Sequence, residues 1–574
     1  MGSFLDFCRR KGARIPEFGR DLWKISMEKC TNSRSENMTD ESEIVAQVAE
    51  RAAAIAQAAE QSSALATINP GEHKLDPWFV IDRLRRNRVG DADLFVTLFR
   101  GRYAYVPEWD KWLYWSGHHW DIDLLCRRAL ADVEQVCAAY QNAMAETAQD
   151  EKSPLYKTMR SRIDKLRTAA GRKEVLECAT SIYNPTVVTA NELDQQHYYL
   201  ATPSGVVDLR TGECNPGKPE QYMLNAIPTE WTGLDTPCPN FKEYLLSCMN
   251  DDQEMADFIV RLLGYGLLGD KFLNIWAIMY GPLSRNGKDT LMNTVKGILG
   301  DQIHVRMGVS LLIEQKFPRD PSRPEPELLA LRGARIAYAS EANPRQALDQ
   351  AKIKDLTGGG FITARGINDK YMTSWKQSAL MILLTNYVPK MDTDDDGFNA
   401  RTLFIEWPVK FVPNPTRDWE RKIDRHMGKK LEAERSGILA LMVRGCMDVL
   451  ANGLRIPEKV LRFTEAQMAA QDDIGRFLKE CCVIEEPPTG SRDYETRIQA
   501  SELLKVCNWW CKKVLGNSYP YSPKKFTPAL EKKGIFTKKS SVTYYMGVTV
   551  KPDLMDEYDD DLKAELEKKS RGNA

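Results

Sequence analysis

Four apolar segments in the middle of the chain have the length and composition of buried β-strands. They are FLNIWAIMY (272–280), RIAYASE (335–341), ALMILLTNYVP (379–389) and TLFIEWPV (402–409). A helical pattern, LMNTVKGIL (291–299), follows the first of them. Strands that alternate with helices are typical of an α/β fold. The pattern therefore predicts an α/β core between residues 276 and 410.

The loop after the first strand has the features of a phosphate-binding loop. Its sequence, GPLSRNGKDT (281–290), puts a Gly-Lys pair between a strand and a helix. Backbone amides and the helix N-terminus then converge on an anion, and Lys288 neutralises the β- and γ-phosphates. The loop departs from the usual pattern, because five residues instead of four separate Gly281 from Gly287 and Asp289 occupies the Ser/Thr position. The alternative is a chance Gly-Lys surface turn.

We expect this loop to bind ATP with Mg²⁺. Thr290, one residue beyond Asp289, supplies the hydroxyl that the usual position lacks. The expected nucleotide-binding residues are Gly281, Arg285, Asn286, Gly287, Lys288, Asp289 and Thr290.

Polar residues accompany the next three strands in the order that an ATPase needs. Glu341 ends the second strand, where a carboxylate orients the attacking water and completes the metal shell. Asn386 follows the third strand and senses the γ-phosphate, and Arg401 precedes the fourth as an arginine finger for a neighbouring subunit. Singly, they also fit a helix cap, a turn and a solvated charge. Together they predict the catalytic set Lys288, Glu341, Asn386 and Arg401, with Asp289, Thr290 and Glu341 at the metal.

A β-hairpin is predicted between the second and third strands. FITARGI (361–367) and YMTSW (371–375) flank the turn Asn368-Asp369-Lys370. ATP hydrolysis does not require such an insertion. In a ring it would project Lys370, with Arg365 and Lys354 near its base, towards DNA phosphates. The alternative is a solvated turn with ordinary charges.

These motifs resemble the superfamily 3 helicases of the AAA+ class, and within them the primase-helicases of phage, plasmid and poxvirus type. The resemblance covers about residues 80–550. It implies a hexameric ring that hydrolyses ATP between subunits and tracks along single-stranded DNA, 3′ to 5′, during replication of a phage, satellite or other mobile element. The segments that carry it are RNGKDT (285–290), RIAYASE, IKDLTGGGFITAR (353–365), LLTNYVP (383–389), Asn399-Ala400-Arg401, RLLGYGLLGD (261–270) and TPSGVVDLRTGE (202–213).

Two further positions differ from the family pattern. Gly360 stands where an acidic residue is usual, and Ser340 leaves one acid at the second strand. We expect Asp289 to supply the metal-directed carboxylate that Ser340 cannot.

The C-terminal part resembles a winged helix. ASELLKVCNWWCKKVLG (500–516) and the segment 521–550 predict a helix pair and a two-stranded ribbon. Beside Tyr544 and Tyr545, a basic stripe would bind an origin duplex. The alternative is that these lysines only solvate a small domain, and the acidic DEYDDD (556–561) does not attract DNA. The stripe consists of Lys524, Lys525, Lys532, Lys533, Lys538 and Lys539.

The length and net charge of the chain limit its domain number and the way it can meet DNA. A chain of 574 residues predicts several domains, and 79 Lys and Arg against 80 Asp and Glu mean that DNA must meet a local basic surface. The 13 cysteines include no CxxC pair and read as reduced thiols. Without a leader or membrane segment, we expect the cytoplasm of a bacterial host cell.

The expected fold class is multidomain α/β. An N-terminal extension with an Ala-rich helix (1–75) precedes an α+β accessory domain (76–235), a helical collar (236–275) and the AAA+ core (276–410). A helical lid (411–475), a winged helix (476–555) and a charged tail (556–574) follow.

A primase site is not expected. Its candidate, Asp121-Ile122-Asp123, lacks a companion His motif or cysteine cluster and reads as a polar turn. We therefore expect a helicase that acts on single-stranded and forked DNA and recruits a separate primase or polymerase. A bifunctional primase-helicase and an ATP-driven protein-remodelling scaffold remain the alternatives.

Overall fold

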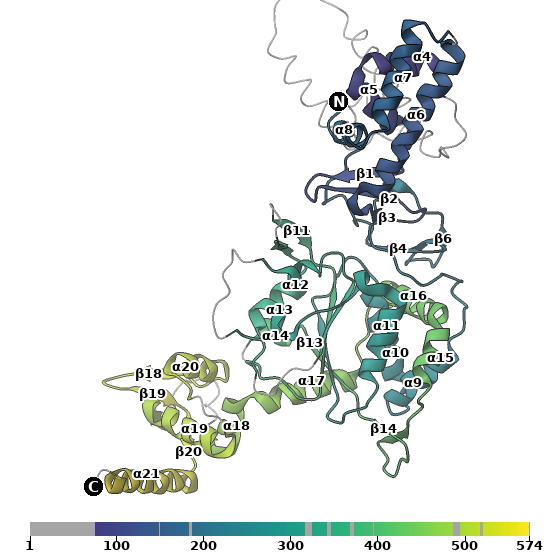
Figure 1. The fold of residues 1–574 in the computed structure, drawn as a ribbon. Coiled ribbons are helices and arrows are strands. Elements are labelled where there is room, and N and C mark those ends of the chain that lie inside the picture. The colour runs from purple at the N-terminus through teal and green to yellow at the C-terminus, as the bar shows by residue number, and fades with distance from the viewer. Residues whose placement is uncertain are drawn as a thin grey trace, which may run out of the picture. The chain divides into compact units, whose positions relative to one another are not determined.

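The structure is a computed structural model, and it describes residues 75–148, 150–182, 186–315, 324–340, 346–367, 372–393, 395–485, 494–516 and 520–572. The Ala-rich helix expected near the N-terminus lies outside these residues. The described chain is a multidomain arrangement of helices and sheets, as the sequence predicts (Figure 1). No helix within it is both long and apolar enough to span a bilayer.

A five-stranded parallel sheet forms the centre of the molecule. Its spatial order is β13 (Thr402–Glu406), β7 (Trp276–Tyr280), β12 (Leu380–Thr385), β9 (Ile336–Ser340) and β8 (His304–Arg306). The four strands expected from the apolar pattern are confirmed. The short edge strand β8 was not expected, because its three residues show no apolar run.

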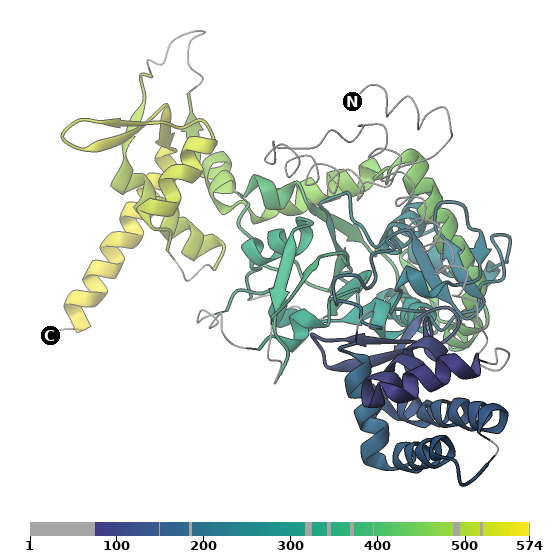
Figure 2. The same ribbon diagram turned by 90° about the horizontal axis from the view of Figure 1, so that it is seen from above.

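Alternate residues of each central strand enter different cores. Ala277 and Met279 pack with α10 (Gln253–Gly266), α11 (Lys288–Ile303) and α16 (Arg435–Asn452). Trp276 and Ile278 pack on the opposite face with α12, α13 and α14 (Figures 1 and 2). Burial on both faces explains why these strands read as continuous apolar runs. The bounds on that second face are α12 Pro326–Leu329, α13 Gln350–Thr357 and α14 Asp396–Asn399.

The strand order determines which chain segments meet at each edge of the sheet. Tyr280, the last residue of β7, pairs with Thr385, and Ser340 of β9 pairs with Leu384. The loop after β7 therefore emerges beside the ends of β12 and β9. Arg401 lies at the opposite edge, where its carbonyl accepts a hydrogen bond from the amide of Trp276 at 2.9 Å.

The accessory domain has a helical core of its own and two small antiparallel sheets. The aromatic segment 103–120 forms most of a three-stranded meander, and the segment 202–213 forms a hairpin in which β4 pairs with β5. Its helices are α4 Pro77–Arg85, α5 Asn87–Phe99, α6 Arg127–Thr147, α7 Pro154–Leu166 and α8 Ala169–Ala179. Its strands are β1 Tyr103–Val106, β2 Lys111–Trp115, β3 Trp120–Ile122, β4 Tyr199–Thr202, β5 Gly205–Asp208 and β6 Cys214–Asn215.

Other elements surround the central sheet. The expected hairpin is β10 (Phe361–Ala364) paired antiparallel with β11 (Thr373–Lys376). Four further elements lie near the loop after β7. They are α9 Pro239–Cys248, β14 Lys410–Val412, β15 Glu420–Lys422 and α15 Met427–Ala433. Helix α17 (Glu458–Gln471) packs on β13, where Thr464 accepts the amide hydrogen of Phe404.

The C-terminal part folds around its own apolar cluster. The expected helix pair is α19 and α20, and the expected ribbon is β18–β19, which β17 extends. The acidic segment read as a tail belongs to a helix, α21, whose Glu557 and Asp561 pair with Lys513 of α19. The bounds are α18 Asp473–Cys481, β16 Cys482–Ile484, β17 Arg497–Gln499, α19 Ala500–Val514, α20 Pro523–Lys532, β18 Thr537–Lys539, β19 Thr543–Met546, β20 Val548–Val550 and α21 Pro552–Gly572.

Candidate functional site

The Gly-Lys loop is a fixed turn between β7 and α11. The amide of Gly281 donates to the carbonyl of Thr385 at 3.0 Å, which ties the start of the loop to β12. Near its end, Arg285 and Gly287 adopt left-handed φ angles of 61° and 98°. The hydroxyl of Tyr244 donates to the carbonyl of Gly287 at 2.6 Å. The extra loop residue is thus accommodated by two left-handed positions, and α11 still begins at the expected lysine.

A Cβ at either glycine would displace a neighbouring side chain. A Cβ on Gly281 would lie 2.0 Å from the amide nitrogen of Asn286 and 2.5 Å from the ammonium of Lys288. A Cβ on Gly287 would lie 2.6 Å from the sulfur of Cys248. Asn286 itself is buried and donates to the carbonyl of Leu283 at 2.6 Å. The loop therefore holds its shape through contacts with α9 and β12 and through the bond between Asn286 and Leu283 within it.

Lys288 is a buried cation at the end of the loop. Its side chain is buried, with the residue 4% exposed, and its ammonium donates to Oδ1 of Asn386 at 3.1 Å. No carboxylate among the described residues forms an ion pair with it. Burial lowers the pKa of Lys288 to about 8. A buried cation with only a neutral partner is unfavourable, and an anion at the start of α11 would compensate it.

A cavity of about 800 Å³ opens beside the loop. This volume suits a small-molecule ligand of nucleotide size. Thr290 of α11 lines it, whereas Asp289 is exposed on the first helical turn, where a negative charge favours the helix dipole. Tyr244 and Phe411 supply aromatic surface, and Asp424 adds a carboxylate.

Sequence reasoning missed most of this cavity. Its walls come from α9, α11, β14, α15, the start of α16 and the loop between β15 and α15, including Asn240, Tyr244, Phe411, Asp424 and Arg435. These residues are spread over nearly 200 positions and form no local motif. Only the packing of α9 and α15 against α11 brings them together.

The expected metal-site carboxylate, Glu341, lies outside the described residues. Strand β9, which precedes it, ends at Ser340 on the same edge of the sheet as the loop. Within the described residues, no group of three or more His, Cys, Asp or Glu side chains is arranged to hold a metal ion.

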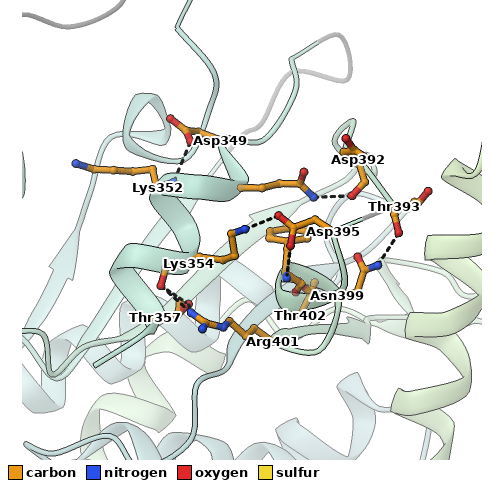
Figure 3. Close-up of polar contacts among 12 residues, drawn as sticks. Asp349, Lys352, Lys354, Thr357, Asp392, Thr393, Asp395, Asn399, Arg401 and Thr402 are labelled. Atoms are coloured by element: carbon orange, nitrogen blue, oxygen red, sulfur yellow. Dashed lines mark hydrogen bonds and ion pairs between the residues drawn. The ribbon is translucent and has the colours of Figure 1, made fainter. Parts of the chain in front are cut away.

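Arg401 is held at the other edge of the sheet by its own chain. Its guanidinium donates to the carbonyl of Lys354 at 2.7 Å and to the hydroxyl of Thr357 at 3.4 Å, both near the C-terminus of α13 (Figure 3). Strand β7 separates this edge from Lys288, and five residues span about 16 Å. Arg401 and Lys288 of one chain therefore do not share a site.

The cationic residues expected near the start of the hairpin are only partly available to a ligand. The ammonium of Lys354 pairs with Asp395 at 2.6 Å, so this ion pair must open before Lys354 can contact a phosphate (Figure 3). The carbonyl of Arg365 accepts the amide hydrogen of Glu325 at 3.0 Å, and Lys370 lies outside the described residues. The described part of the hairpin instead exposes apolar side chains, those of Phe361, Ile367 and Met372.

The C-terminal lysines divide into two groups. Lys533 pairs with Asp472 and holds α20 against α18, which is a structural role that its position in a basic run did not reveal. Tyr545 is likewise a core residue, with its hydroxyl bonded to Thr527. Tyr544 lies beneath the guanidinium of Arg497 at 4.8 Å. The exposed lysines are Lys524, Lys525, Lys532, Lys538 and Lys539.

Asp121 and Asp123 have structural partners in the accessory domain. Asp121 accepts the hydroxyl of Tyr114 at 2.9 Å and contacts His119 at 3.1 Å. Both oxygens of Asp123 accept backbone amides at the start of α6, at 2.9 and 3.1 Å. Asp121 lies in strand β3 rather than in the expected turn, and Asp123 caps a helix.

Comparisons with known proteins relate the chain to viral replication proteins. Residues 92–250 match the model of a family described as D5 N terminal like. A protein of Acanthamoeba polyphaga mimivirus named "Putative helicase L207/L206" is 27% identical over 320 residues, covering 53% of this chain and 33% of that protein. A protein of African swine fever virus, named as a "Putative primase", is 31% identical over 248 residues, covering 39% of this chain and 24% of that protein.

The chain spans a third or less of the length of these two relatives. Among solved structures, the apo structure of the NrS-1 C-terminal region aligns with 81% of this chain and 100% of that chain. The TM-score is 0.43 and the sequence identity is 13%.

Proposed function

We propose that the chain is a member of the D5-like primase-helicases and an ATP-dependent DNA helicase that acts in replication. The observation that carries the proposal is the buried ammonium of Lys288, which lies at the start of α11 with Asn386 as its neutral partner. This arrangement favours a bound anion at the start of α11. The cavity beside the loop, which Gly287 and Thr290 line but Lys288 does not, has room for a small molecule of nucleotide size.

The residues present fit ATP with Mg²⁺. Lys288 would hold the β- and γ-phosphates, and the hydroxyl of Thr290, on the wall of the cavity, would serve as a metal ligand. Asp289 and Glu341 would supply carboxylates. The metal ion, when bound, neutralises the charge that develops on the phosphates during transfer. Asn386 would exchange its bond to Lys288 for a contact with the γ-phosphate and orient it for attack by water.

We further propose that the ATP site is completed by a second copy of the chain. Arg401 lies at the sheet edge opposite Lys288, so it serves as an arginine finger only for a neighbouring subunit. The strand order, with the Gly-Lys strand β7 between β12 and β13, supports an AAA+ core. A ring of this kind, a hexamer by family resemblance, would draw single-stranded DNA 3′ to 5′ through its centre.

Two surfaces would contact DNA. The β10–β11 hairpin would reach the strand in the channel, and the exposed lysines on α20 and β18 would bind duplex at an origin through a winged helix. Deletion of residues 473–572 should lower duplex affinity, and unchanged duplex binding would contradict the assignment of that part.

A bifunctional primase-helicase is the second candidate. It is favoured by the African swine fever virus relative, whose name describes a primase. The roles of Asp121 and Asp123 in hydrogen bonds within the domain give it no support from this part of the chain. Template-dependent primer synthesis by the pure protein would select it.

Unwinding of a forked DNA duplex with ATP and magnesium tests the proposal. The wild type is compared with Lys288→Ala and with Lys296→Ala, a matched control in the same helix whose exposed side chain pairs with Asp301. We expect unwinding and ATP hydrolysis to disappear only in Lys288→Ala. Hydrolysis by the wild type without DNA dependence or strand separation would overturn the helicase assignment in favour of protein remodelling.

A further inference from the structure

The accessory domain contains a basic groove far along the chain from every residue discussed for DNA binding. Its volume is about 680 Å³, and it lies between the start of α5 and one face of α7. The charged side chains that line it are all cations, namely Arg86, Arg88, Lys157, Arg162 and Lys165. The other lining residues are Asn87, Val89, Thr158 and Ser161, so no carboxylate lines the groove.

Two basic runs of the sequence meet in this groove. RLRRNR (83–88) holds four arginines in six residues, and α7 supplies the second run about 70 residues later. Along α7, Lys157, Ser161 and Lys165 recur at four-residue intervals and therefore lie on one face. From Lys157 to Lys165 the helix rises about 12 Å, which is the axial length of three to four nucleotides of one strand in duplex DNA.

Arg162 is held in place at the groove wall. One terminal nitrogen donates to Oδ2 of Asp91 at 3.2 Å, and the other donates to Oδ1 of Asn87 at 2.6 Å. Asp91 is almost fully buried, and it is fixed by the hydroxyl of Tyr140. Asn87 has a left-handed φ of 55°, a conformation that asparagine tolerates well. The guanidinium is thus fixed in place, and its charge is paired with the buried carboxylate of Asp91.

Neighbouring acidic residues that do not line the groove form ion pairs with several of its cations. Glu174 on α8 pairs with Arg88 and Lys165, each at 3.0 Å. The side chains of Arg88 and Lys165 remain 57% and 41% exposed, respectively, so each retains donors for a ligand. Lys157 is exposed and forms no ion pair within the described part of the chain. Arg86 pairs with Asp82 at 3.1 Å, so among the described residues Lys157 is the one lining cation without a carboxylate partner, and none of the partner carboxylates lines the groove.

We propose that this groove binds the phosphodiester backbone of DNA, as a site separate from the hairpin and the C-terminal lysines. The ligand class follows from charge complementarity, from the cation spacing along α7 and from the hydroxyl group of Ser161, which suits a phosphate oxygen. The contact is independent of sequence and keeps the accessory domain on the same strand that the ATPase moves. That DNA supplies the phosphates rests on the proposed function.

The test is equilibrium binding by fluorescence anisotropy, without ATP, across a range of salt concentrations. Fluorescein-labelled single-stranded and duplex DNA are titrated with the full chain carrying Lys157→Ala, Lys157→Glu or Lys157→Arg. Lys111→Ala, on strand β2 of the same domain, is the matched control because Lys111 is exposed and outside the groove. Thermal unfolding of each variant checks that the fold is intact.

We expect Lys157→Ala to lower the slope of log K against log salt by about 0.7 to 0.9, and the affinity at ~0.15 M salt about five-fold. Lys157→Glu should weaken binding further, whereas Lys157→Arg and Lys111→Ala should match the wild type. A loss with single strands only, or with duplex only, supports the groove and identifies its ligand. The proposal that the groove binds DNA is overturned if the Lys157 variants bind DNA as the wild type does, or if they lose affinity while the salt slope stays the same. The proposed function fails separately, if the wild type neither hydrolyses ATP nor unwinds a fork.

Discussion

The ammonium of Lys288 lies 3.1 Å from Oδ1 of Asn386 and donates a hydrogen bond to it. Lys288 begins α11 and Asn386 directly follows β12, so the bond joins the Gly-Lys loop to the end of the neighbouring strand. Because the asparagine is neutral, it satisfies a donor of the ammonium without neutralising its charge. Under the proposed function, a phosphate would compete with Asn386 for Lys288.

The affinity for ATP should fall as pH rises above about 8. The pKa of Lys288 is about 8 in the folded protein, below the ordinary value of about 10.4, so the free site loses its positive charge in this range. A fluorescent ATP analogue titrated between pH 7 and 9.5 measures the effect. Lys288→Arg, which does not titrate there, should show no such decline, and an equal decline in both proteins would refute the explanation.

The same shift predicts how stability depends on pH. Since the folded-state pKa lies below the unfolded value, the unfolded chain binds more protons between about pH 8 and 10.4. The contribution of Lys288 to the free energy of unfolding therefore rises with pH in that window and is constant below it. This contribution is isolated by comparing the free energy of urea unfolding of the wild type and Lys288→Met at pH 7 and 9.5. A difference between the two proteins that does not change with pH would argue against the lowered pKa of Lys288.

Asn386→Asp should weaken ATP binding by about ten-fold or more. A carboxylate would form an ion pair with Lys288, raise its pKa and compete with the phosphates. Asn386→Ala removes the bond without adding charge, so its main effect should be on turnover. Calorimetric Kd values and kcat for both variants separate these effects. Equal Kd values for the two variants would show that the contact does not control phosphate binding.

Gly281→Ala should abolish ATP binding, because its Cβ would lie 2.0 Å from Asn286 and 2.5 Å from Lys288. The matched control is Gly360→Ala, whose Cβ would have no atom within 4 Å. Nucleotide binding and thermal unfolding are measured together. Normal ATP affinity in folded Gly281→Ala protein would mean that the Gly-Lys loop is not the nucleotide site.

Arg401→Ala and Lys288→Ala should complement each other in mixed oligomers. The two residues lie at opposite edges of the sheet, so each variant alone lacks part of every site, whereas a mixture forms some intact ones. ATP hydrolysis is measured after unfolding and refolding the variants together. Mixtures that stay as inactive as the separate variants would exclude a finger acting between subunits.

Asp289→Ser should raise the magnesium concentration needed for half-maximal ATP hydrolysis. Asp289 is exposed beside the start of α11, where a carboxylate can reach a metal bound at the phosphates. A magnesium titration of hydrolysis compares it with Asp301→Ser, an acid at the other end of the same helix. Full activity with an unaltered magnesium requirement would remove Asp289 from the metal site.

The sequence by itself determined the local elements. The four apolar strands, the Gly-Lys turn, the hairpin and the C-terminal helix pair were predictable, because each follows from periodicity and turn residues within about a dozen positions. The resemblance to primase-helicases rested on the same short motifs. The structure also shows that Lys288 and Asn386, nearly 100 residues apart, are in contact.

Only the tertiary structure decided which residues meet. The parallel pairing of β13 with β7 put Arg401 at the edge opposite Lys288, and packing turned Lys354 and Lys533 towards Asp395 and Asp472. The cavity beside the loop and the basic groove between α5 and α7 likewise join segments distant in the chain. Charge and polarity are properties of single residues, whereas the distance between two charges depends on the path of the whole chain, and the local pattern does not specify that path.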